Sequence, residues 1–449
     1  MKKNKTIDFA AWGLVLVVLF AVPLIVSTFY AAPEQGPAKN PSVLVMFLSL
    51  LGFILLTTVA LWGQIILGRT RSISDRGSLS SGTLNTMNLH NKLIGGLFIV
   101  SGFVKLQDPL GFSYKLDDYW TVFQEYTGFF PAEFFHELSI PMAMFISVFE
   151  IVLAFALMTG YRMRLSSLLA FLMMIFFTFL TGFAVITNSV TDCGCFGDAL
   201  KLTPLQSFEK DILLTLSILP IYLMRKRIRP YYRNPFPLGL VTLSALVFGY
   251  ISYHCLNHLP IFDFRGAYTV GQDLNYNMNT FDEEEGQPIA HDFYPFCQDC
   301  GKGKPDFEGA TLYIVCYGMD HHSSKNYVEA IELVRELETK APGLKVCSGT
   351  DVPGSVRREL PIDNLDELCL SSQDSKMLKT MIRSSPGYIL LKDGVVQKKW
   401  HYNDKPSPEQ LIELGGNTTT QLPPPPPPPP APDTTSIDTN AVDSLEENP

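Results

Sequence analysis

Cysteines are the residues of this 449-residue sequence with the most evident chemistry, and two pairs of the eight are closely spaced. Cys193 and Cys195 flank a single glycine, and a disulfide between them would close a very small, strained ring. Strained disulfides are more easily reduced than structural ones. We therefore predict that Cys193 and Cys195 are a thiol–disulfide exchange pair and the catalytic residues of any activity. A static disulfide, two free thiols and a metal site remain the alternatives.

The second pair, Cys297 and Cys300, has the Cys-x-x-Cys spacing and precedes the first strand expected in the second half of the chain. It is either a structural disulfide that pins a turn or a secondary redox pair that serves Cys193 and Cys195, with a metal site as the third interpretation. We assign no metal to either pair. Of the other cysteines, Cys316 is expected in a core and Cys255 as a buried thiol, while Cys347 and Cys369 both border strands and could pair.

Long apolar stretches in the first half of the chain predict a membrane protein, because a crossing needs about 20 such residues with all backbone groups paired. The net charge of −9 comes mostly from the second half, and no basic stripe indicates nucleic acid. The expected partner is therefore the lipid bilayer. We count about seven spans, two of them weak: Phe9–Phe29, Val43–Leu67, Leu89–Val104, Ile140–Met158, Leu165–Ile186, Asp211–Met224 and Pro237–His254.

Lys and Arg are concentrated in every second loop between these stretches. This is the pattern expected when the N-terminus is cytoplasmic. In this count Lys92 lies in a cytoplasmic loop and Lys210 in an outer one. The second half of the chain is then outside, which in a bacterial inner membrane means the periplasm. All eight cysteines fall outside or at the outer membrane edge, where disulfides persist.

Glu150 is the acid within the fourth span, and Lys105 ends the third. Charged groups inside a membrane are costly and usually face a partner or a cavity, so we expect these two to pair. The pair serves either proton or quinone handling or the structural linkage of two helices.

The region 276–415 alternates strands and helices in the order expected for an α/β thioredoxin-like domain. Strands are expected at Thr311–Tyr317, Leu344–Val346, Tyr388–Leu391 and Val395–Trp400, and helices at Lys325–Leu337 and Ser375–Ile382. Residues 286–413 resemble the thioredoxin family, in which a cis-proline stands at the position of Pro386. The cysteine pair typical of that family is absent from the matching stretch Met319–Ser324.

Residues 89–225 resemble the MauE/DoxX group of membrane proteins, which are four-helix bundles linked to disulfide and quinone chemistry. The resemblance is carried by Gly102-Phe-Val-Lys105, Asp108-Pro-Leu-Gly111, Glu150 before Gly160, Asp192-Cys-Gly-Cys-Phe-Gly-Asp198 and Leu202-Thr-Pro-Leu-Gln-Ser-Phe208. The run Asn257–Arg265 resembles a Bacteroidetes subgroup in which this bundle carries a thioredoxin-like domain.

These observations divide the chain into five regions. We expect two additional spans and a loop in 1–88, the MauE/DoxX-like bundle in 89–225, a last span and periplasmic linker in 226–275, the thioredoxin-like domain in 276–415 and a disordered proline-rich tail in 416–449.

The resemblance implies a membrane thiol–disulfide redox protein, with periplasmic thiol proteins as clients and a quinone as an electron acceptor. The alternative is a non-catalytic membrane anchor whose degenerate thioredoxin-like domain binds partners. Whether the chain is an enzyme therefore stays open at this level.

The topology can be tested without reference to any family. A reporter that works only in the periplasm is expected to be active when fused after Leu274 and inactive when fused after Arg229, because a single crossing separates the two positions. The opposite pattern would refute the placement of the cysteines.

Overall fold

The structure, a computed structural model, describes residues 41–66, 81–188, 202–228, 231–232, 235–280, 290, 308–319 and 323–416. Cys193, Cys195, Cys297 and Cys300 lie outside the described residues, as do the expected first span Phe9–Phe29 and most of the proline-rich tail.

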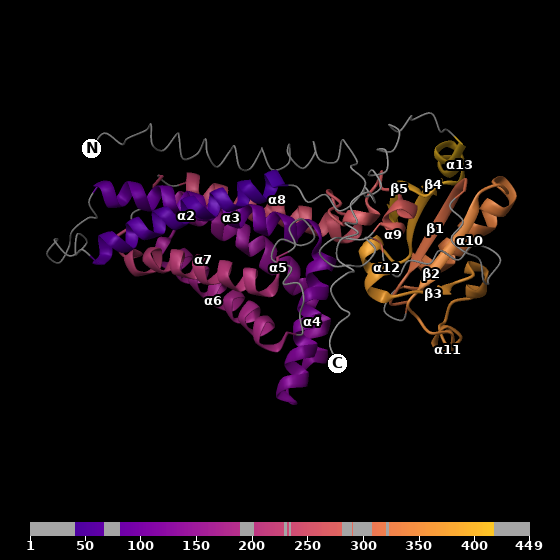
Figure 1. The fold of residues 1–449 in the computed structure, drawn as a ribbon, viewed down its shortest axis with the longest axis horizontal. Coiled ribbons are helices and arrows are strands. Elements are labelled where there is room, and N and C mark those ends of the chain that lie inside the picture. Colours follow the sequence, from indigo (N-terminus) through magenta and orange to yellow (C-terminus); the bar gives the residue numbers. More distant parts are fainter. Residues whose placement is uncertain are drawn as a thin grey trace, which may run out of the picture.

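Helices make up the first half of the described chain, and a mixed sheet with its own helices makes up the second (Figure 1). The helices of the bundle are α2 (Pro41–Ile66), α3 (Ser81–Gln107), α4 (Pro109–Thr127), α5 (Ala132–Thr159), α6 (Met163–Thr187), α7 (Pro204–Met224) and α8 (Phe236–Asn257). We call the end of the bundle that carries Gln107 and Asn257 the domain end, because the sheet domain follows it.

Four of the described helices are long and apolar enough to cross a membrane: Gly82–Gln107, Ala132–Thr159, Met163–Thr187 and Phe236–Asn257. A shorter apolar stretch, Leu50–Ile66, lies in α2. The chain is thus a multi-pass membrane protein, whereas seven spans and an inside N-terminus stay predictions.

Two lysines do not lie where the charge count put them. Lys92 is a fully buried residue of α3, which begins at Ser81, and it lies inside the expected span Leu89–Val104 rather than in the loop before it. Lys210 is buried in α7, which begins at Pro204 behind a capping box between Thr203 and Gln206. The expectation that both lysines occupy loops is therefore wrong: hydropathy alone missed the polar first turns of these helices.

Helices α3 and α5 approach each other closely because small residues line their contact. A β-carbon at Gly102 would lie 2.7 Å from Ile151 Cγ1 and 3.0 Å from the carbonyl oxygen of Ser147. Gly95 meets Ala154 and Met158 in the same way two turns earlier. Small residues at such positions let membrane helices pack through their backbones. This contact fixes Lys105 on α3 relative to Glu150 on α5.

Helix α4 is an element that the sequence analysis did not anticipate. Asp108 caps its N-terminus by accepting a hydrogen bond from Gly111 N (2.9 Å), Pro109 occupies the first turn, and Gly128 ends it in the left-handed conformation. The helix runs across the domain end of the bundle, steeply inclined to α2 and α3 (Figure 1).

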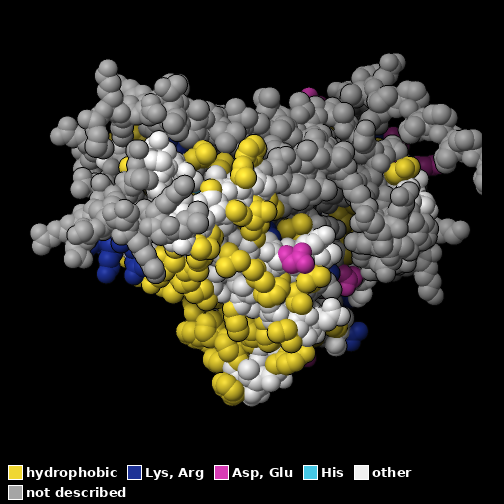
Figure 2. Space-filling model, turned by 60° about the vertical axis from the view of Figure 1, so that its left-hand side comes forward, with side chains coloured by type: hydrophobic (Ala, Val, Ile, Leu, Met, Phe, Trp, Pro, Cys, Tyr) yellow, Lys and Arg dark blue, Asp and Glu magenta, His cyan; other side chains and the backbone are white. Residues whose placement is uncertain are grey.

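Hydrophobic side chains cover much of the described outer surface of the bundle (Figure 2). Exposed apolar residues occur on several of its helices and include Leu56, Phe145, Leu172, Phe179 and Leu246. A surface of this kind is expected to contact lipid rather than water.

The sheet domain contains five strands in the order β3-β2-β1-β4-β5. The strands are β1 (Ala310–Cys316), β2 (Lys345–Thr350), β3 (Ser371–Ser372), β4 (Gly387–Lys392) and β5 (Val395–His401). β1 pairs parallel with β2, from Thr311 opposite Lys345 to Cys316 opposite Thr350, and antiparallel with β4. β2 and β3 are parallel, and β4 and β5 are antiparallel.

Alternate residues of β1 point into two hydrophobic cores, one on each face of the sheet. Leu312 and Ile314 pack with α10 (Ser324–Lys340) and α13 (Pro408–Gly416), whereas Tyr313 and Val315 pack with α12 (Ser375–Met381). The remaining short helices are α9 (Leu274–Asn279), α11 (Gly354–Arg357), η2 (Gly266–Tyr268), η3 (Leu365–Leu368) and η4 (Tyr402–Asp404).

Most strands and helices expected in the sheet domain lie within a few residues of their predicted places. Asp393 and Gly394 have positive φ and form the turn between β4 and β5. The Ser385–Pro386 peptide bond is cis. β3, α11 and α13 were not anticipated, because each is too short for its periodicity to stand out.

Candidate functional site

A buried ion pair joins α3 and α5 near the domain end of the bundle. Lys105 Nζ lies 2.6 Å from Glu150 Oε2, and the two side chains are only 3% and 4% exposed. Lys105 also donates a hydrogen bond to Ser101 Oγ (3.0 Å), one turn earlier on α3. Its ammonium lies 5.0 Å from the centre of the Phe177 ring, so apolar and aromatic groups surround the pair.

A second pair of charges, Lys210 and Asp211, lies at the start of α7. Lys210 Nζ is 2.5 Å from Asp211 Oδ1, and both side chains are buried. Asp211 Oδ2 accepts a hydrogen bond from Thr181 of α6 (3.1 Å). This ion pair lies within α7, and the hydrogen bond from Thr181 to Asp211 links α7 to α6.

One small cavity is lined by both ion pairs, together with Ser101 and apolar residues of α3, α6 and α7. Its volume of about 20 Å³ is enough for one water molecule. The four charges sum to zero, which is how ionised groups persist in an apolar interior. The cluster therefore places two carboxylates, two amines and room for one water molecule close to the domain end.

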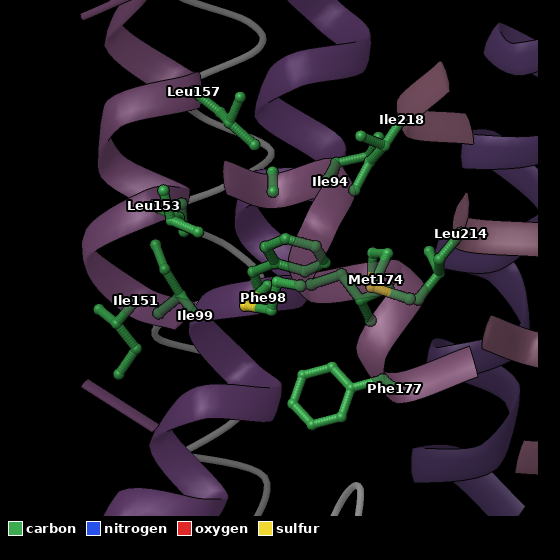
Figure 3. Packing of buried hydrophobic residues seen from close by; sticks show 14 of the residues in the cluster. Ile94, Phe98, Ile99, Ile151, Leu153, Leu157, Met174, Phe177, Leu214 and Ile218 are labelled. Atoms are coloured by element: carbon green, nitrogen blue, oxygen red, sulfur yellow. The ribbon is translucent and has the colours of Figure 1, made fainter. Parts of the chain in front are cut away.

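An apolar layer closes this cluster toward the far end of the bundle. Phe98, Met174 and Leu214 converge there from α3, α6 and α7, with Ile94 and Ile218 one turn further on (Figure 3). His90 lies beyond the layer, where it contacts Thr57 Oγ1 (2.8 Å) and the carbonyl oxygen of Ser217 (2.9 Å). Two polar regions of the bundle are thus separated by hydrocarbon.

The sheet domain contacts the bundle at its domain end. Arg383 Nε lies 2.9 and 3.0 Å from the two carboxylate oxygens of Asp108, and Tyr114 of α4 packs against the sheet core that contains Tyr317. Burial opposes ionisation of Asp108, but Arg383, with Arg265 and the Gly111 N–H, outweighs burial and holds the pKa of the carboxyl below its ordinary value.

Further contacts tie η4 to the end of α8. Asn403 Nδ2 donates to the carbonyl oxygen of Asn257 (2.7 Å), and His258 Nδ1 lies 2.7 Å from Asp404 Oδ2. The turn that contains Ser385 and Pro386 is part of the docked end, since Arg383 immediately precedes it. This end of the sheet domain is therefore held against the bundle.

Asp263, in the segment after α8, forms ion pairs with two cations, Arg265 of the same segment and Lys399 of β5. Arg265 Nε lies 2.5 Å from Asp263 Oδ1, and Lys399 Nζ lies 2.8 Å from Oδ2. Burial opposes ionisation of Asp263 too, but the two cations and their hydrogen bonds hold the pKa of the carboxyl well below its ordinary value.

Among the cysteines that the structure describes, Cys255 and Cys316 are free and buried. Burial raises the pKa of the Cys316 thiol far above its ordinary value, so this residue is an inert core thiol. Cys347 and Cys369 are both disulfide-bonded. The structure does not test the roles predicted for Cys193, Cys195, Cys297 and Cys300.

Sequence reasoning singled out Lys105 and Glu150 but missed Lys210, Asp211, Asp108 and Arg383 as parts of a site. Adjacent opposite charges within a weak span were the available signal for Lys210 and Asp211, since a helix that crosses lipid must pair them. No pattern linked Asp108 to Arg383, which lies 275 residues later in the chain.

The described geometry defines a class of protein: a multi-pass helical membrane protein with a buried charged cluster and an attached mixed-sheet domain. Within it, residues 87–223 match the family model described as Methylamine utilisation protein MauE. The matched segment begins in α3 and ends in α7, so it contains the whole charged cluster. The protein is thus similar to the MauE family over this segment, which is less than a third of the chain.

No curated protein and no solved structure shows significant similarity to the chain. The family match therefore stands alone among the comparisons. The relationship to DoxX proteins and to a Bacteroidetes subgroup stays a prediction.

The ion pair between Lys105 and Glu150 predicts an asymmetry between single and double variants. Lys105→Met leaves a buried carboxylate without its cation and is expected to cost about 3–5 kcal/mol of stability. The double variant Lys105→Met/Glu150→Gln is expected to cost less than either single change. Unfolding of the full chain in lipid nanodiscs measures both.

The matched control for this comparison is Glu367→Ala, which breaks the exposed pair between Arg335 and Glu367 and is expected to leave the stability nearly unchanged. A loss for the double variant equal to the sum of the two single losses would show that the charges of Lys105 and Glu150 are not coupled.

Lys399 predicts a dependence of stability on pH. Burial lowers its pKa from 10.5 to about 8, with Arg265 and Arg383 acting in the same direction and Asp263 against it. Between these values the unfolded chain holds more protons than the folded one, so this group's contribution to stability rises with pH. The stability of the wild type relative to Lys399→Met is expected to increase across that interval.

Thermal unfolding of both proteins at a series of pH values checks this. Lys398→Met removes the neighbouring exposed lysine and provides the control. A difference between wild type and Lys399→Met that stays constant with pH would contradict the expectation.

Proposed function

We propose that this chain is a membrane thiol–disulfide redox protein of the MauE/DoxX type, in which Cys193 and Cys195 exchange a disulfide with client proteins at the periplasmic face. The observation that carries the proposal is the match of residues 87–223 to the MauE family, since that segment contains both cysteines and the buried charged cluster.

The position of the charged cluster supports this function. Cys193 and Cys195 belong to the segment that connects α6 with α7, and Thr181 and Asp211 hold those two helices together close to the ends that this segment joins. Asp211 is eight residues beyond Thr203, or about 12 Å along α7. Carboxylates and amines at this depth suit thiol chemistry, because each cycle of a dithiol releases or takes up two protons.

In the proposed step, a client thiolate attacks the Cys193–Cys195 disulfide, and one of these two cysteines leaves as a thiolate. A second client thiol then resolves the mixed disulfide. The client ends with a disulfide and Cys193 and Cys195 end as two thiols, so that two electrons pass from the client to the membrane protein.

A quinone is the electron acceptor implied by the family resemblance, but it does not fit the cavity beside Lys105 and Glu150. The cavity beside Lys105 and Glu150 holds about one water molecule, which is far less than a quinone ring needs. We therefore assign no step to a quinone at that position.

The sheet domain belongs to this proposal as a thioredoxin-like domain. Its strand order, β3-β2-β1-β4-β5, with β4 antiparallel to both of its neighbours, β1 and β5, supports that assignment. Its first strand ends at Cys316, a buried thiol, and no cysteine follows before Ser324. We propose that this domain presents or receives the client, while Cys193 and Cys195 carry the exchange and Cys297 and Cys300 are its secondary pair.

Trapping of mixed disulfides tests the proposal. In cells that express Cys193→Ser or Cys195→Ser, the remaining thiol cannot be resolved within the pair, so covalent complexes with periplasmic proteins are expected on non-reducing gels. Cys255→Ser is the control, because Cys255 is free and buried and its loss leaves the exchanging pair intact. No complex with either variant, and full alkylation of both thiols in growing wild-type cells, would sink the proposal.

A second candidate function is a non-catalytic membrane anchor that assembles partners. The observation that favours it is the docking of the sheet domain onto the bundle through Asp108, Arg383 and Tyr114, which holds the domain in one place. Full function of a Cys193→Ser/Cys195→Ser variant would support this candidate over the first.

A further inference from the structure

A small cavity lies where the last turn of α3 meets the segment that leads from α8 to the sheet domain. Pro260, Phe262 and Phe264 supply apolar walls, and Gln107, Asp108 and Arg265 supply the polar ones. Its volume of about 20 Å³ is enough for one water molecule or one monatomic ion. Two sequence patterns noted above, Asp108-Pro-Leu-Gly111 and Asn257–Arg265, lie at this place, and the proposed thiol chemistry uses neither.

Two hydrogen-bond donors at this cavity have no acceptor among the described residues: Gln107 Nε2 and Arg265 Nη1. The amide orientation of Gln107 is defined, because its Oε1 accepts a hydrogen bond from Phe262 N (3.0 Å). Gln107 is fully buried and Arg265 is 6% exposed, so bulk water does not satisfy them. Buried donors of this kind require an acceptor.

The charges around the cavity favour an acceptor that is negative. Arg265 and Lys399 share the single carboxylate of Asp263, and the other hydrogen bond of Lys399 goes to a carbonyl oxygen, that of Met381. Two cations with one carboxylate leave one positive charge in excess at this point.

Asp108 also lines the cavity, and its carboxylate is the one group there that would repel an anion. Both of its oxygens lie within hydrogen-bond distance of Arg383, and Oδ1 also accepts from Gly111 N. Because Arg383 balances the charge of Asp108, the excess positive charge from Arg265 and Lys399 remains.

We propose that this cavity is a binding site for a halide ion, which accepts hydrogen bonds from Gln107 Nε2 and Arg265 Nη1. A water molecule would satisfy the two donors but would leave the positive charge in place. Oxyanions such as sulfate exceed the space. The ion joins the end of α3 to the segment that holds the sheet domain, so that its binding strengthens the junction between the two parts of the protein.

The effect of halide on thermal unfolding tests the site. The full chain in lipid nanodiscs is unfolded in sodium chloride, bromide, gluconate and sulfate at equal ionic strength. A ligand that binds the folded state raises the unfolding temperature with its concentration. We expect a rise of a few degrees in chloride and bromide over gluconate and sulfate. Equal unfolding temperatures in all four salts would overturn the proposal and leave water as the occupant.

Gln107→Glu places a fixed negative charge at the proposed position of the ion, while its carboxylate can still accept from Phe262 N. This variant is expected to lose the response to halide and to unfold in gluconate no earlier than the wild type does in chloride. Gln124→Glu makes the same change on the exposed side of α4 and is expected to keep the response. An undiminished halide response in Gln107→Glu would show that the ions act at another surface.

A measurement on the wild type decides the matter if Gln107→Glu does not fold. Chloride-35 NMR linewidths are followed while the nanodisc-embedded protein is titrated with bromide. Broadening that bromide competes away, with one site per chain, is expected. Broadening that never saturates would indicate adventitious ions only and would refute the site.

Discussion

Pairing of charge inside an apolar bundle is the constraint on which the membrane half of this protein depends. Lys105 and Glu150 neutralise each other at 2.6 Å only because glycine and small side chains bring α3 and α5 close together. Lys210 and Asp211 pair within α7, and Asp211 also accepts a hydrogen bond from Thr181 of α6. Four helices are thereby linked at one depth, near the domain end and directly outside the apolar layer of Phe98, Met174 and Leu214.

The same end of the bundle holds the sheet domain, so the two halves of the chain meet where the polar groups are. Helix α4 lies across the ends of the other helices and offers Tyr114 to the sheet core, while Asp108 binds Arg383 beside the Pro386 turn. The thiol chemistry that we propose belongs to the chain segment that connects α6 and α7.

Sequence patterns predicted those elements whose physical signal is long or strongly periodic. The apolar stretches of α5, α6 and α8 and the alternating strands β1, β4 and β5 are examples. The sequence patterns missed α4, whose amphipathic surface is too short and too polar for a hydropathy window, and the helical positions of Lys92 and Lys210. In the site, Lys105 and Glu150 could be paired because few partners exist within a membrane. The contact between Arg383 and Asp108 could not be predicted, because it depends on how the sheet domain docks on the bundle.

Asp108 has two roles that do not compete with each other. Its Oδ1 accepts the N–H of Gly111 and so completes the first turn of α4, and this bond lies wholly within the bundle. The contact with Arg383 adds to that bond without replacing it. A bundle without the sheet domain would therefore keep an intact start to α4. The membrane segment thus carries the docking residue as part of its own fold, so that a soluble companion is received without any change to the start of α4.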